Sequence, residues 1–85
     1  MTIAELILEL QGIKDQSRIV ILQKDAGGNG YSPLAGIDVN AAYTAYSTWS
    51  GDVGLETLTP ELQKQGFTRE DVASGEPCLV LYPTN

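Results

Sequence analysis

Apolar residues near the start of the chain recur every three or four positions, which is the spacing of one face of an α-helix. Thr2 can cap this helix, and Glu5 three residues later completes a capping box. The repeating positions are Ile3, Leu6, Ile7, Leu10 and Ile13. The pattern predicts an amphipathic helix over residues 2–13 that packs on one face of a sheet.

Two other segments are continuously apolar, which is typical of strands that are covered on both faces. They span residues 19–22 and 79–82, and Pro77 and Pro83 bracket the second segment. Prolines suit strand ends because they lack the N–H donor of the ladder. We expect the two segments to be neighbours at the centre of the sheet, with Cys78 as a buried core thiol.

The middle of the chain has a weaker pattern. Ile37 and Val39 alternate with polar residues, as in a half-exposed strand. Residues 41–48 mix alanines, threonines and tyrosines, which suits a strand or an extended arm. If this segment is a strand, Tyr43 and Tyr46 face opposite sides. A hairpin and a long loop both fit.

Two short helical turns are predicted before the last strand. Thr59 precedes Pro60, the pairing of an N-cap with a proline at the first helical position, and Gly66 ends this helix. Thr68 and Asp71 form a second capping box. The fold class is therefore α+β: a small mixed or antiparallel sheet, an N-terminal helix on one face, and short helices before the last strand.

Length and composition predict one compact domain over residues 1–85. The 42% of hydrophobic residues suffices for a single small core. A chain of this size gains stability by burying more surface in an assembly, so we expect a homo-oligomer. The first residues carry two glutamates and no basic leader, and no apolar run is long enough for a membrane span. These features predict a cytoplasmic protein with no membrane partner.

Charge and missing residue types restrict the chemistry. Eleven acidic and five basic residues give a net charge of −6, which argues against direct nucleic-acid binding. This charge suits a basic partner, or it serves only to keep a small protein in solution. The chain has no histidine and one cysteine, which removes the common general base and most metal sites. The spacing of Asp25, Asp38 and Asp52 matches no ion-binding loop. We expect no enzymatic activity, no metal and no cofactor.

The candidate site starts in a glycine-rich stretch, residues 25–34, and continues into an aromatic segment. Clustered glycines allow backbone N–H groups to form an anion-accepting nest, and Asn-Gly is a strong turn signal. Aromatic faces can stack on a ligand, and hydroxyls can orient it. Alternatively, the aromatic side chains pack a second layer on the sheet and the glycines form a plain turn. The candidate ligand-binding residues are Lys24, Gly28, Asn29, Gly30, Tyr31, Ser32, Tyr43, Tyr46, Thr48 and Trp49.

Several motifs together resemble a group of short tailed-bacteriophage accessory proteins. They are Asn-Gly-Tyr-Ser-Pro-Leu, Thr-Trp-Ser-Gly, Leu-Thr-Pro-Glu-Leu and Phe-Thr-Arg-Glu-Asp-Val, after an amphipathic helix and an apolar strand. The resemblance implies a gene expressed in the cytoplasm of an infected bacterium. By analogy with small phage accessory proteins, it implies binding to a host factor, including defence systems.

Two functions follow as hypotheses. In the first, the chain is a non-catalytic counter-defence protein that sequesters a small nucleotide immune signal. Lys24, the glycine backbone and Ser32 hold phosphate, while Tyr31, Tyr46 or Trp49 stacks on a base. In the second, the chain is an acidic inhibitor of a host defence complex, anti-CRISPR-like or mimicking nucleic acid, with aromatic anchors. A virion component or a simple regulator is a third possibility.

Overall fold

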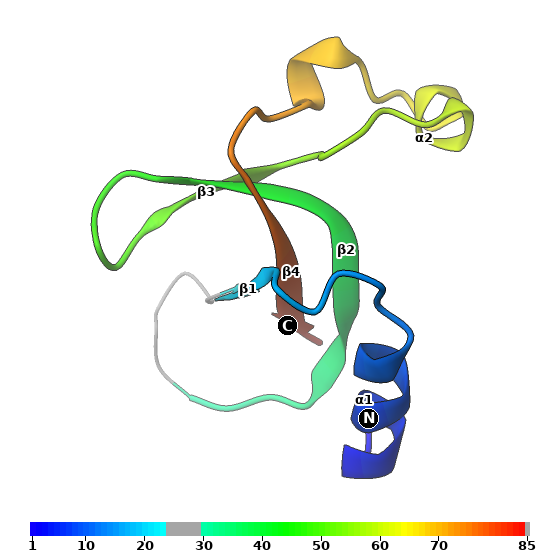
Figure 1. The fold of residues 1–85 in the computed structure, drawn as a ribbon, viewed down its shortest axis with the longest axis vertical. Coiled ribbons are helices and arrows are strands. Elements are labelled where there is room, and N and C mark those ends of the chain that lie inside the picture. The colour runs from blue at the N-terminus through cyan, green and yellow to red at the C-terminus, as the bar shows by residue number, and fades with distance from the viewer. Residues whose placement is uncertain (24–29, 85) are drawn as a thin grey trace.

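Four strands form one mixed sheet, with a helix before them, in a computed structural model that describes residues 1–23 and 30–84 (Figure 1). The predicted α+β class is confirmed, including the N-terminal helix and the short helices before the last strand. The elements are α1 (Ile3–Gln11), β1 (Ile19–Leu22), β2 (Leu34–Ala45), β3 (Gly51–Gly54), α2 (Pro60–Lys64), the 3-10 helix η1 (Arg69–Asp71) and β4 (Glu76–Pro83).

The two apolar segments are neighbours, as predicted, but only one of them is central. The strand order is β1-β4-β2-β3; β1 is parallel to β4, and the β4–β2 and β2–β3 pairs are antiparallel. The expectation that β1 is a covered central strand is wrong. It is an edge strand of the sheet, and alternate residues, Val20 and Leu22, are exposed. A continuous apolar run gives the strand propensity but not the strand order.

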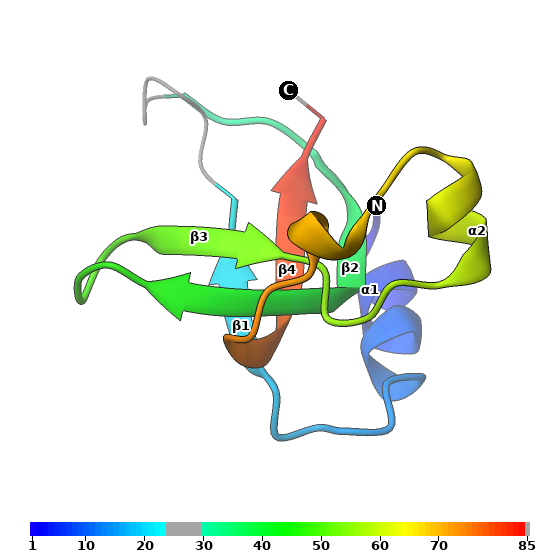
Figure 2. The ribbon, with the colours of Figure 1, turned by 90° about the horizontal axis from the view of Figure 1, so that it is seen from above.

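The middle segment forms a long hairpin, one of the two arrangements left open by its sequence. β2 changes register against β4 between Leu34 and Gly36 and again between Asp38 and Ala41. Such irregularities bend a strand and increase its twist. β2 stays paired with β4 as far as Tyr43, and its last two residues continue as a ribbon with β3, which projects across the sheet (Figures 1 and 2).

Helix α1 forms as predicted, with the capping box between Thr2 and Glu5. The Thr2 N–H donates to Glu5 Oε1 at 2.9 Å, and the Glu5 N–H donates to Thr2 Oγ1 at 3.1 Å. The apolar stripe is less covered than expected. None of the helix residues is buried, and Ile3 is 81% exposed. Local capping and periodicity form this helix without deep packing.

The short helices also begin where their caps predict. The Thr59 side chain accepts from the Leu62 N–H, and the Thr68 side chain accepts from the Glu70 N–H at 3.3 Å. Gly66, with φ of 104°, follows α2. This backbone angle is strained for residues with a side chain, so glycine suits the helix end.

An ion pair joins the start of β1 to the chain after β3. Arg18 Nη1 lies 2.7 Å from Glu56 Oε2, and Nη2 donates to Oε1 at 3.1 Å. The hydrogen bond to Glu56 raises the pKa of the Arg18 guanidinium. Nη1 also donates to the carbonyl of Cys78 at 3.3 Å. One side chain thus links three segments that are far apart in the sequence.

The buried core is small. Within the described residues, the buried hydrophobic positions are Ala41, Ala42, Cys78, Leu79 and Val80. Cys78 is fully buried, as predicted. Strand β4, one of the two inner strands, supplies three of these five buried positions, and β2 supplies the other two.

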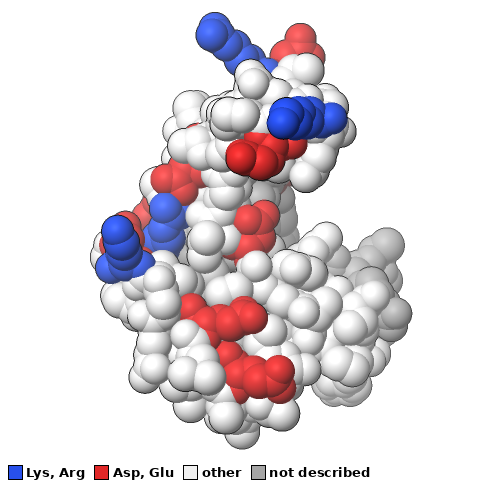
Figure 3. Space-filling model, turned by 90° about the vertical axis from the view of Figure 1, so that its right-hand side faces the viewer, with Lys and Arg blue, Asp and Glu red and all other residues white. Residues whose placement is uncertain are grey.

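The face in Figure 3 carries acidic side chains over its middle and lower parts, with basic side chains toward the top and one side.

Candidate functional site

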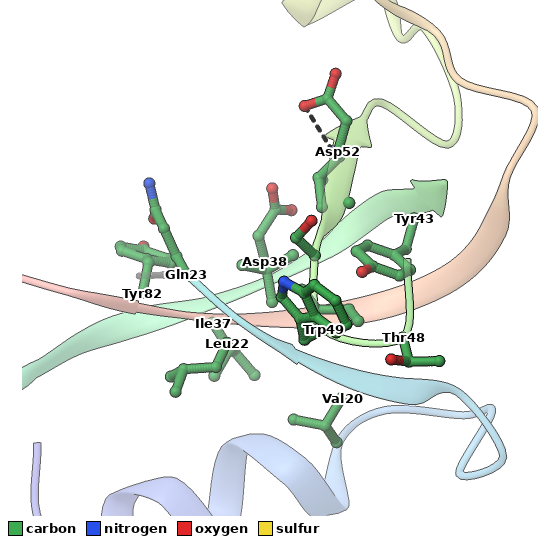
Figure 4. Close-up of a pocket in the computed structure, with 15 residues that line it drawn as sticks. Val20, Leu22, Gln23, Ile37, Asp38, Tyr43, Thr48, Trp49, Asp52 and Tyr82 are labelled. Atoms are coloured by element: carbon green, nitrogen blue, oxygen red, sulfur yellow. Dashed lines mark hydrogen bonds between the residues drawn. The ribbon is translucent and has the colours of Figure 1, made fainter. Parts of the chain in front are cut away.

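A groove of about 990 Å³ lies between strand β1, the sheet surface and the β2–β3 turn (Figure 4). Val20 and Leu22 of β1 border this groove, although their side chains point toward the α1 side in Figure 4. The described lining residues are Val20, Ile21, Leu22, Gln23, Ile37, Asp38, Tyr43, Thr48, Trp49, Ser50, Gly51, Asp52, Val53, Val80 and Tyr82.

The floor of the groove follows from the strand register. Ile21 of β1 is opposite Val80 of β4, and Val80 is opposite Asp38 of β2. Residues that are opposite one another in a ladder share a face of the sheet. The floor therefore changes from apolar at the β1 side to a carboxylate on β2.

Two tyrosines border this floor, and each lies over a glycine. A Cβ at Gly36 would be 2.6 Å from the hydroxyl oxygen of Tyr82, and a Cβ at Gly51 would be 2.5 Å from the hydroxyl oxygen of Tyr43. The missing side chains at these two positions leave the space that the rings occupy. Tyr43 also packs against the core cluster, which fixes it more firmly than a surface side chain.

The β2–β3 turn carries Trp49 over the groove (Figure 4). The Tyr46 N–H donates to the Ser50 carbonyl at 2.9 Å, which closes the turn. Ser47 Oγ accepts from the N–H groups of Trp49 and Ser50 at 3.3 and 3.2 Å. These bonds order the backbone beneath Trp49, while its residue surface stays 75% exposed. The turn thus holds a large aromatic residue at a defined place.

The groove is acidic. Asp38 Oδ1 accepts from the Asn40 N–H at 2.9 Å, and Asp52 accepts from its neighbour Val53 at 3.0 Å. Asp52 Oδ2 also accepts from the Tyr46 hydroxyl at 3.3 Å, and the negative charge of Asp52 raises the pKa of Tyr46. Neither lysine nor arginine occurs among the lining residues that the structure describes. The described part of the groove surface therefore favours cationic groups over anions.

The structure brings together three of the predicted site residues, Tyr43, Thr48 and Trp49. Tyr46 instead lines a smaller hollow of about 370 Å³ next to η1. Three more predicted residues, Gly30, Tyr31 and Ser32, are exposed and do not line the groove; Gly30 has φ of 87°, in agreement with a turn. The remaining predicted residues, Lys24, Gly28 and Asn29, are outside the described residues.

Apart from Tyr43, sequence reasoning missed the residues that strands contribute to the groove. Asp38 and Tyr82 are far apart in the sequence and approach one another only because β2 pairs with β4. The alternation around Ile37 and Asp38 did predict that Asp38 projects from the other face of a strand. It could not indicate which strand lies beside it.

Few groups in the described structure are suited to covalent chemistry. Burial raises the pKa of the Cys78 thiol, which is unfavourable for a nucleophile. In residues 1–23 and 30–84, no three histidine, cysteine or carboxylate side chains are grouped as metal ligands. The groove is therefore suited to holding a ligand by stacking, apolar contact and charge.

Comparison with models of protein families, with curated protein sequences and with solved structures gives no match to this chain. Of the helices in the described part of the chain, none has the length and apolar character needed to cross a membrane.

Proposed function

We propose that this chain is a non-catalytic binding protein whose groove receives a basic side chain of a protein partner, in the manner of an acidic inhibitor. One observation carries the proposal: the groove combines the largely exposed residue Trp49 with the carboxylates of Asp38 and Asp52, and its described lining contains no cation.

An arginine suits this combination. A guanidinium that stacks on a tryptophan gains about 0.5–2 kcal/mol, and it can also bond a carboxylate such as that of Asp38. The apolar floor at Ile21 and Val80 accommodates the aliphatic part of the same side chain. The resemblance to phage accessory proteins makes a host defence protein with a basic surface the natural partner.

Sequestration of a small nucleotide is the second candidate, and Trp49 favours it. A base that stacks on an exposed aromatic side chain gains about 1–3 kcal/mol, and Thr48 lines the same groove as Trp49. The phosphates would need the amides and the lysine of residues 24–29, which are outside the described residues. Asp38 and Asp52 repel phosphate, so the described groove favours the basic partner.

Trp49 is the only tryptophan, so its fluorescence reports directly on the groove. We would titrate the protein with an arginine-rich peptide, an acidic peptide of equal length and a cyclic dinucleotide. The proposal expects saturable quenching or a spectral shift with the basic peptide, weakening as salt rises. Binding of the dinucleotide alone would support sequestration instead.

A matched pair of variants separates groove binding from general attraction to an acidic protein. Asp38→Asn removes one charge in the groove and keeps the oxygen that accepts from Asn40. Glu9→Gln removes one charge on α1, away from the groove lining. We expect Asp38→Asn to weaken the binding of the basic peptide at least about fivefold and Glu9→Gln to change this affinity little. Equal effects would contradict binding in the groove.

A further inference from the structure

We propose that two copies of this chain associate through β1, whose outer edges pair antiparallel around a twofold axis at Ile21. Among the described strands, β1 is hydrogen-bonded to β4 alone. The Gln23 N–H donates to the Leu81 carbonyl at 2.9 Å, so the backbone groups of Gln23 face β4. Backbone groups alternate in direction along a strand. Those of Ile21 therefore face β4, and those of Val20 and Leu22 face outward.

These outward groups match those of a second copy. In an antiparallel pair centred on Ile21, Val20 of one copy is opposite Leu22 of the other. Both residues present a free N–H and a free C=O, so each such pair exchanges two hydrogen bonds. The twofold axis repeats the same pair on its other side. The edge is thus complementary to itself, as an isologous interface requires.

The two outer strands of the sheet differ in their protection. Exposed strand edges commonly carry charges, prolines or bulges that prevent pairing. β3 contains Asp52, and directly after it Leu55 bonds to Asp71 and Ala73, at 2.8 and 2.9 Å. β1 is Ile-Val-Ile-Leu, with an unbroken register against β4 and no charge or proline. The negative charge of the chain is therefore outside the strand that would pair.

Side-chain burial favours the same pairing. Val20 and Leu22 are 60% and 67% exposed and share one face of the strand. In the proposed pair, each covers the other across the interface, which removes apolar surface from water. The small core leaves the monomer with little buried apolar surface, so this gain matters more than in a larger domain.

The assembly state tests the proposal without any ligand, so its result is independent of the proposed groove function. We would measure sedimentation velocity over a range of protein concentrations, and expect a reversible dimer. Val20→Pro removes an N–H that the β4 ladder does not use, whereas the control Val20→Thr keeps it. We expect monomer for the proline variant and dimer for the threonine variant. If Val20→Pro does not fold, Leu22→Lys provides the same test through charge repulsion.

A cross-link tests the register. Ile21 of the two copies would form a non-hydrogen-bonded pair, with Cα atoms about 4.5 Å apart, within the range of a disulfide. The native Cys78 is buried and gives little background. We expect Ile21→Cys to form an intermolecular disulfide under mild oxidation. Val20→Cys places the thiols on diagonal positions about 7–8 Å apart, which disfavours the bond.

Each result has a defined meaning. A wild-type protein that stays monomeric at the highest concentration overturns the proposal. So does a dimer that survives both Val20→Pro and Leu22→Lys, because its interface must lie elsewhere. A dimer in which Val20→Cys cross-links as fast as Ile21→Cys overturns the proposed register. Loss of the dimer in the edge variants, with selective cross-linking at Ile21→Cys, supports it.

Discussion

Two leucines on neighbouring strands provide a direct test of the described burial. Leu79 of β4 is 4% exposed, while Leu22 of β1 is 67% exposed. Both occur in strands of the same sheet, and β1 and β4 pair with each other. The same substitution, leucine to alanine, therefore compares burial in an inner strand with burial in an edge strand.

The expected magnitudes differ several-fold. Leu79→Ala loses the burial of the removed carbons and leaves a cavity, which together cost about 2–5 kcal/mol in a packed core. Leu22→Ala loses only the buried third of the side chain, which is worth about 0.5–1 kcal/mol. A domain of this length has a free energy of unfolding of about 4–13 kcal/mol. Leu79→Ala thus removes a large fraction of the stability.

Urea unfolding followed by far-UV circular dichroism measures both variants. We expect a much lower midpoint for Leu79→Ala and an unchanged slope for each variant. The measurement should be made at low protein concentration, because self-association would add to the cost at Leu22. Similar losses for the two variants under dilute conditions would refute the described difference in burial. If the destabilisation caused by Leu22→Ala instead grows with protein concentration, this would indicate that two copies pair through β1.

Three further predictions concern single side chains. Trp49→Ala should lower the free energy of unfolding by less than about 1.5 kcal/mol, because the residue is 75% exposed, yet weaken the binding of an arginine-rich peptide at least about tenfold in calorimetry. Tyr43→Ala should lower both the free energy of unfolding and the affinity for the peptide, because Tyr43 packs against the core cluster. A strongly destabilised Trp49→Ala variant would place Trp49 in the core. Cys78 should react slowly with a thiol reagent in native buffer and rapidly in urea, since burial raises its pKa; fast native labelling would contradict the described burial. Hydrogen bonds from the Thr2 backbone and hydroxyl lower the pKa of Glu5, so its stabilisation is present above the ordinary glutamate value of about 4.3 and is lost as the pH falls through the lowered value. The helical signal should decline in that range, and Glu5→Gln should flatten this decline.

Local signals predicted much of the fold. The caps at Thr2, Thr59 and Thr68 each start a helix at the expected residue, because the bonds that define a cap join residues two or three positions apart. The pairing of the two apolar segments was also correct. These features depend on spacing and residue type, which the sequence states directly.

Non-local geometry explains the errors. β1 has the composition of a central strand, yet its place at one side of the sheet depends on where β2 pairs. The twelve residues of β2 include glycine, aspartate, asparagine and alanines, which have weak strand propensity, so the length of the strand was not predicted. Its bend arises from register shifts that depend on β4 as well as on its own residues.

The candidate site shows the same division. Tyr43, Thr48 and Trp49 lie close together in the sequence and meet in the groove, so the aromatic cluster was found. Tyr31 belonged to the same sequence cluster but is fully exposed and does not line the groove. Asp38 was considered only as a metal ligand. Its place beside Val80 makes it part of the acidic groove, and only the strand pairing could show this.

Salt distinguishes the two proposed contacts, because it should act on them with opposite signs. A cation in the groove is attracted by Asp38, by Asp52 and by the net charge of −6, so added salt should weaken the binding of a basic peptide. Two copies repel one another through that same charge, while the β1 edge that joins them is uncharged. Screening should therefore strengthen the dimer. Peptide titration and sedimentation over one salt series measure both slopes. A dimer that weakens with salt would mean that ion pairs, and not the apolar strand edge, hold the copies together.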